Sequence, residues 1–131
     1  MGSKLLVRDE TTLGQSSHSL MLTFPTERIT VQELIRSRIY QEVKDYNVKL
    51  SDHFHGLVKP TEAEQTLNGY KLRLPRKIDW EKQYEQAIEA FLGNGFIVLV
   101  DDQQVDSLEE QIEIRSNTSV SFLKLVPLVG G

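Results

Sequence analysis

The stretch Ile29-Thr30-Val31-Gln32-Glu33-Leu34 contains the clearest helix start in the chain. Thr30 and Glu33 have the spacing of a capping box, in which each side chain accepts a hydrogen bond from the backbone N–H of the other residue. Ile29 and Leu34, at the two ends of the stretch, have the spacing of a hydrophobic staple. The apolar residues that follow at helical spacing are Val31, Leu34, Ile35, Ile39, Val43 and Tyr46. This stripe predicts an amphipathic helix that ends near Asn47 and buries one face.

Two segments that predict strands precede this helix, at residues 4–9 and 18–24. In the second segment, Leu20, Leu22 and Phe24 fall on one face at a period of two, which is typical of a half-buried strand. The residues between the segments have the composition of a turn. The two segments therefore predict a hairpin that opens the fold, although its loop is longer than the tightest hairpin turns.

The chain after residue 95 contains several short strand patterns. Residues 96–100 form the longest apolar run, residues 101–104 have turn composition, and residues 111–115 and 120–126 predict further strands. A hairpin, a crossover helix and a strand that returns beside the hairpin make an α+β fold. We therefore expect one mixed sheet wrapped on one main helix.

Residues 48–95 interrupt this plan and predict an insertion within a single domain of residues 1–131. Residues 48–78 predict mostly exposed loop, with one short strand or hairpin after the turn signal Asn68-Gly69. Asp79 is a candidate N-cap for a second helix. The apolar stripe of that helix consists of Trp80, Tyr84, Ala87, Ile88 and Phe91, and Gly93-Asn94-Gly95 predicts its end.

The chain closes on Pro127-Leu128-Val129-Gly130-Gly131, directly after a predicted strand. The proline removes a ladder donor and fixes φ, which predicts the end of the sheet and a flexible, extended tail at residues 127–131. The two glycines have no Cβ, so the tail can enter a narrow channel and its carbonyl can be approached from either face. The leucine and the valine are then the side chains that a partner can contact. A terminal segment without any chemical role is the alternative.

These features together resemble the ubiquitin-like β-grasp superfamily. The resemblance rests on the capped helix after a hairpin, on the strand and turn of residues 96–105, and on the ending from Phe122 to Gly131. It is closest to the MoaD and ThiS sulfur carriers and to related prokaryotic ubiquitin-like modifiers, and it covers residues 4–47 and 96–131. The central insertion has no counterpart in it.

The resemblance implies a carrier or substrate and not an enzyme. In this family an activating enzyme, a MoeB/ThiF-like adenylyltransferase, binds the domain and holds the tail, here at Pro127, Leu128 and Val129. It then adenylates the terminal carboxylate, here that of Gly131 next to Gly130. ATP and Mg²⁺ belong to this partner, so no intrinsic cofactor is expected.

Transfer of the activated tail to lysine amines on target proteins would make the chain a protein modifier. A conjugating enzyme and a deconjugating peptidase would then be further partners. Two alternatives stay open: a sulfur carrier with a terminal thiocarboxylate, and a non-covalent β-grasp interaction domain. The insertion favours the modifier, because additional surface suits additional partners.

Composition limits the remaining classes of protein. A length of 131 residues suits one domain, and 39% apolar with 26% charged residues is typical of a globular protein. The net charge of −4 argues against nucleic-acid binding. No segment has the length of a membrane span, and the N-terminus lacks a secretory apolar region. The absence of cysteine fits a reducing compartment, so a cytoplasmic location is expected.

The other candidate clusters are expected to be surface features. His53 and His55 could share a metal ion, but the chain has no cysteine and only His18 as a third histidine, so ordinary loop histidines are favoured and no metal site is expected. The acidic residues that predict solvated turns are Asp101, Asp102, Asp106, Glu109 and Glu110. The basic patch of Lys71, Arg73, Arg76 and Lys77 suits an acidic protein surface better than nucleic acid. No set of serine, histidine and acid predicts catalysis.

Overall fold

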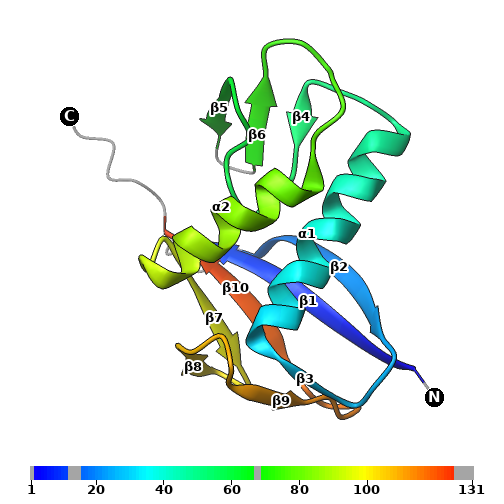
Figure 1. Cartoon of the computed structure of the whole chain (residues 1–131), viewed down its shortest axis with the longest axis vertical. Coiled ribbons are helices and arrows are strands. Elements are labelled where there is room, and N and C mark those ends of the chain that lie inside the picture. Colours follow the sequence, from blue (N-terminus) through cyan, green and yellow to red (C-terminus); the bar gives the residue numbers. More distant parts are fainter. Residues whose placement is uncertain (1, 12–15, 67–68, 126–131) are drawn as a thin grey trace.

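The computed structural model describes residues 2–11, 16–66 and 69–125, and its architecture is α+β (Figure 1). A mixed five-stranded sheet has the order β2-β1-β10-β7-β8. Its strands are β1 (Ser3–Thr11), β2 (Ser16–Phe24), β7 (Phe96–Val100), β8 (Gln103–Val105) and β10 (Val120–Lys124). β10 runs parallel to β1, and the other neighbouring pairs are antiparallel. The predicted hairpin and returning strand are thus confirmed.

The main helix, α1 (Val31–Val48), begins at the predicted capping box. The Thr30 hydroxyl accepts from the Glu33 N–H at 3.1 Å, and the Glu33 carboxylate accepts from the Thr30 N–H at 3.4 Å. Every residue of the predicted apolar stripe is buried. Arg38 and Glu42 are buried on the same helix as well, a result that the sequence pattern did not predict.

A second, two-stranded sheet supports the start of α1. It pairs β3 (Arg28–Thr30) with β9 (Gln111–Glu113) in antiparallel register. The Val31 N–H, one of the free donors of the first helical turn, donates to the Glu110 carbonyl at 2.9 Å. The strand predicted at residues 111–115 is therefore real but shorter, because it pairs only with the three residues of β3.

The insertion contains a third sheet, which corrects the expectation of mostly exposed loop. Its strands are β4 (His53–Phe54), β5 (Ala63–Thr66) and β6 (Gly69–Leu72), in the order β4-β6-β5. The buried apolar residues of this sheet and of the loops that adjoin it are Phe54, Leu57, Val58, Ala63, Tyr70, Leu72 and Ile78. Strands of two to four residues are too short for an alternating pattern to stand out. Leu74, two residues after Leu72, is 73% exposed because β6 has already ended.

The second helix, α2 (Trp80–Leu92), also begins where the sequence predicts. The Asp79 carboxylate accepts from the Glu81 N–H at 3.0 Å. In the predicted apolar stripe of α2, Ala87 and Phe91 are buried, whereas Trp80, Tyr84 and Ile88 are only partly buried. The reason is that α2 packs on α1 and contacts the main sheet mainly at β7. The left-handed residue after it is Asn94, with φ of 59°.

The turn between β7 and β8 is shorter than predicted. Asp101 and Asp102 have φ of 50° and 66°, and Gln103 and Gln104 already belong to β8. Two consecutive left-handed residues give a turn whose twist matches that of the flanking strands. The predicted strand at residues 120–126 ends at Lys124, and residue 126 lies outside the described residues.

Both helices cover one face of the main sheet (Figure 1). The inward side chains of its strands, such as Leu5, Leu22 and Phe122, are almost fully buried. The opposite face carries Leu6 and Met21, which are paired across β1 and β2 and are 49% and 53% exposed. Within the described ranges, neither helix is long and apolar enough to cross a membrane.

Candidate functional site

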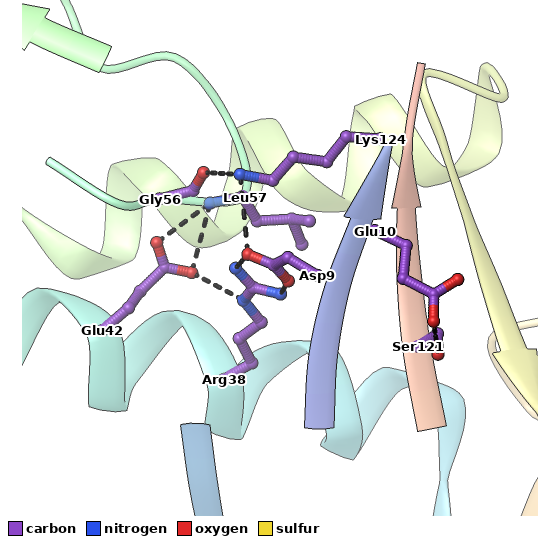
Figure 2. Close-up of polar contacts among 8 residues, drawn as sticks. All are labelled: Asp9, Glu10, Arg38, Glu42, Gly56, Leu57, Ser121 and Lys124. Carbon is purple, nitrogen blue, oxygen red and sulfur yellow. Dashed lines mark hydrogen bonds and ion pairs between the residues drawn. The ribbon is translucent and has the colours of Figure 1, made fainter. Parts of the chain in front are cut away.

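The inward face of the main sheet changes from apolar to polar near the carboxyl end of β10. Along β1, the buried Val7 is followed by the buried Asp9. Along β10, the buried Phe122 is followed by Lys124. His18 of β2 is the cross-strand partner of Asp9. The insertion covers this polar end, and charged groups from β1, α1 and β10 meet there (Figure 2).

Arg38 forms the centre of this charged cluster. Its guanidinium donates to both carboxylate oxygens of Asp9, with Nη2 to Oδ2 at 2.7 Å, and its Nε donates to Glu42 Oε1 at 3.1 Å. The Arg38 side chain is fully buried, and its Cζ lies 4.6 Å from the centre of the Phe122 ring. Burial is the largest influence on the pKa of Asp9 and would raise it, but the charge and hydrogen bonds of Arg38, together with the Lys124 charge, outweigh burial and lower the pKa.

Glu42 connects α1 to the insertion. Its Oε2 accepts from the Leu57 N–H at 3.0 Å, while its Oε1 accepts from Arg38. Burial raises the pKa of Glu42 to about 7, against the pull of the Arg38 charge. A carboxyl group that holds the insertion therefore titrates near neutral pH.

Lys124, the last residue of β10, reaches the same loop of the insertion. Its Nζ donates to the Gly56 carbonyl at 2.6 Å and lies 3.6 Å from Asp9 Oδ2 and 5.9 Å from the centre of the Tyr70 ring. Burial lowers the pKa of Lys124, and the Asp9 charge opposes that shift. The cluster thus combines two cations with two carboxyl groups, one of which titrates near neutral pH.

The three histidines of the chain gather beside this cluster. The ring of His18 stacks on that of His55, with centroids 5.0 Å apart, and the rings of His55 and His53 meet edge to face at 4.5 Å. Burial lowers the pKa of His18, and the Asp9 charge opposes the shift. The sequence placed His53 and His55 together, whereas only the fold brings His18 of β2 to them.

A cleft of about 530 Å³ lies between β2, α1 and the insertion, and the three histidines line it. Among the residues that the structure describes, no three histidines, aspartates or glutamates are arranged to hold a metal ion. The charges of the cluster are engaged with one another, which suits the positioning of chain segments more than the transfer of protons.

The predicted site residues themselves, Pro127, Leu128, Val129, Gly130 and Gly131, lie outside the described residues. The described chain ends one residue after β10, at Leu125, which is 41% exposed. The charged cluster therefore lies directly before the predicted reactive segment. Sequence reasoning missed it, although Arg38 and Glu42 are four residues apart within the apolar stripe of α1.

The other predicted clusters stay separate from this site. The acidic residues after β7 are exposed, as expected for solvated turns. In the basic patch, Lys71 faces Glu64 across β5 and β6, and Arg76 donates to the Thr61 carbonyl. Acidic groups thus border the basic ones, and the patch does not form a uniformly positive surface.

No protein-family model matches this sequence, and no curated protein matches it either. The proposed function therefore depends on the residues and the geometry described above.

Proposed function

We propose that this chain is a ubiquitin-like protein modifier of the β-grasp type, activated at the carboxylate of Gly131 and transferred to lysine amines of target proteins. The observation that carries the proposal is that β10, which follows α1 in the chain, returns to pair in parallel with β1. A hairpin, a helix and a strand that returns beside the hairpin are the elements on which the β-grasp resemblance rests. The insertion is an addition to that plan.

The position of β10 supports a reactive tail. β10 is the central strand of the main sheet, between β1 and β7, and it ends at Lys124. Leu125 is already exposed there, so the sequence that continues to Gly131 starts at the protein surface. A tail that follows a central strand directly has a rigid base, which suits delivery of its end to a partner.

The uncovered face of the main sheet supports a docking partner. Leu6 and Met21 are exposed on it, and Ile97 and Leu123 are paired across β7 and β10 and half-buried. Apolar side chains on an exposed sheet face are typical of protein interaction sites. We propose that the adenylyltransferase binds this face while it holds Pro127, Leu128 and Val129.

The chemistry follows from the tail. A Gly131 carboxylate oxygen attacks the α-phosphorus of ATP, and pyrophosphate leaves with the bonding electrons. An amine or thiolate then attacks the carbonyl carbon of the adenylate, AMP leaves, and the amine loses a proton. ATP, Mg²⁺ and the catalytic groups belong to the partner, so the chain acts as a carrier and not as an enzyme. We also propose that it acts in the cytoplasm, since it has no cysteine.

The test is to incubate the purified chain with a MoeB/ThiF-like adenylyltransferase, ATP, Mg²⁺ and a lysine-containing acceptor, and to measure intact masses. An amide between Gly131 and lysine supports the modifier. A mass gain that corresponds to oxygen replaced by sulfur at the carboxylate supports the sulfur carrier instead. No adduct with any such enzyme would leave only the non-covalent interaction domain.

Deletion of Gly131 is the matched control. We expect loss of transfer with an unchanged circular dichroism spectrum, because the described core ends before residue 126. Retained transfer by this variant would contradict the proposed role of the tail.

A further inference from the structure

The end of β10 is held from outside the main sheet by the insertion. Within the sheet, Lys124 pairs with Thr11 of β1 and with Phe96 of β7. Outside it, the Lys124 ammonium donates to the Gly56 carbonyl and lies near the Tyr70 ring, and both of these residues belong to the insertion. The side chain that closes the strand is therefore also the side chain that connects β10 to the insertion.

The loop that receives Lys124 is fixed from a second direction. Its next residue, Leu57, donates its N–H to Glu42 on α1 at 3.0 Å. The single peptide group between Gly56 and Leu57 thus binds β10 through its carbonyl and α1 through its N–H (Figure 2). Both contacts are made by ionisable side chains, of which Glu42 is buried and Lys124 half-buried, and their charged forms make stronger hydrogen bonds than neutral groups do.

Gly56 allows this close approach. A Cβ at this position would lie 2.1 Å from Cε2 of Phe54 and 2.7 Å from Oε2 of Glu42. A residue with a Cβ here would therefore force the Phe54 ring, the Glu42 carboxyl group or the loop itself to shift, which disturbs the contacts that hold this peptide group. The loop is built to lie against both partners at once.

We propose that the insertion is a clamp on the end of β10, with Lys124 as the positioning residue that sets where and in which direction the chain leaves the sheet. The use of this clamp in tail transfer rests on the proposed function, while the clamp itself does not. The clamp gives the otherwise unassigned insertion a role in presenting the segment that follows Leu125.

A fixed exit from the sheet favours partner binding for an entropic reason. Ordering a free segment on binding costs conformational entropy for each side chain that becomes immobilised, and a base that is already fixed avoids part of that cost. Loss of the clamp should therefore weaken productive binding of the tail. It should leave the chemical step almost unchanged, because the catalytic groups belong to the partner.

The direct test measures the position of the strand end and needs no partner. Since the chain has no cysteine, Lys59→Cys and Leu125→Cys can be labelled cleanly with nitroxides, and their distance distribution measured by pulsed electron paramagnetic resonance. Both positions are exposed, one in the insertion and one directly after β10. We expect one narrow distribution for the labelled protein and a broad one after Lys124→Met.

Two further variants keep this test decisive. Lys44→Met makes the same chemical change at an exposed site on α1 and should leave the distribution narrow. Gly56→Ala loosens the clamp from the insertion side and should broaden the distribution, even if Lys124→Met does not fold. A distribution unchanged in both Lys124→Met and Gly56→Ala would overturn the clamp.

The kinetic arm tests the use of the clamp. With an adenylyltransferase that accepts the wild-type chain, Lys124→Met should raise KM about tenfold at nearly unchanged kcat, and Lys124→Arg should recover part of the loss. A broadened distribution with unchanged KM would refute the positioning role. If no such enzyme activates the wild-type chain, the proposed function fails, while the spectroscopic result still decides the clamp.

Discussion

The Lys124 ammonium, at the end of β10, donates to the carbonyl of Gly56, a residue 68 positions earlier in the chain, at 2.6 Å. This contact joins the central strand of the main sheet to the insertion. It belongs to a buried cluster whose other charged members are Asp9, Arg38 and Glu42. Arg38 is the partner shared by both carboxyl groups, so its removal leaves two buried acidic side chains without their main cation.

Arg38→Met should therefore be strongly destabilising. The guanidinium is fully buried and is bound by both carboxylates, so its loss leaves Asp9 and Glu42 without their main partner. Breaking a buried ion pair by removing one partner costs about 3–5 kcal/mol. Urea unfolding followed by circular dichroism measures the change in the free energy of unfolding.

Arg36→Met is the control for this variant, because Arg36 is exposed on the same helix and makes a cation–π contact with Trp80. We expect its cost to be about 1 kcal/mol or less. Equal effects of the two substitutions would show that the cluster adds no stability beyond that of a surface arginine.

Glu42→Gln should change how stability depends on pH. The ordinary pKa of this carboxyl is 4.5 and the folded-state pKa is about 7, so between these values the folded protein binds a proton that the unfolded chain releases. This group therefore makes the wild type less stable as pH rises from about 4.5 to 7. Glutamine does not titrate, so the variant should not show this loss. The difference in the free energy of unfolding, variant minus wild type, should therefore increase as pH rises through this window.

The measurement is the free energy of unfolding from urea titrations between about pH 5 and pH 7. Glu33→Gln is a matched control on an exposed residue of the same helix. Parallel pH profiles for the wild type and Glu42→Gln would contradict the prediction.

His18→Gln should change the pH dependence in the opposite direction. The folded-state pKa of His18 is below the ordinary 6.5, so in mild acid the unfolded chain binds a proton that the folded protein does not. The wild type therefore loses stability as pH falls below about 6.5, and the variant should lose less. The same urea titrations test this, and a steeper loss in the variant would contradict the assigned direction.

Local sequence signals predicted the elements that depend on local physics. The capping box at Thr30 and Glu33 and the cap at Asp79 gave the starts of both helices, because each cap is satisfied within three residues. The period-two pattern ending at Phe24 gave the longest strand pair. These features do not need knowledge of distant contacts.

The charged cluster could not be predicted in the same way, because its partners are far apart in sequence. Arg38 and Asp9 are 29 residues apart, and either residue alone would be assigned to the surface from its charge. The one local signal was the position of Arg38 and Glu42 inside an apolar helix stripe. The small sheet of the insertion was missed because its strands are too short to show a period.

Met21→Arg should separate partner binding from folding. Met21 lies on the uncovered face of the main sheet and is 53% exposed, so an arginine there meets solvent and should change the free energy of unfolding by about 0.5 kcal/mol or less. If the adenylyltransferase docks on this face, the new charge would be buried against apolar surface and should weaken binding about tenfold or more. Leu74→Arg is the matched control, since Leu74 is 73% exposed in the insertion, away from this face. Isothermal titration calorimetry with the enzyme measures the affinity of both variants, and equal affinities for Met21→Arg and the wild type would exclude this face as the docking surface.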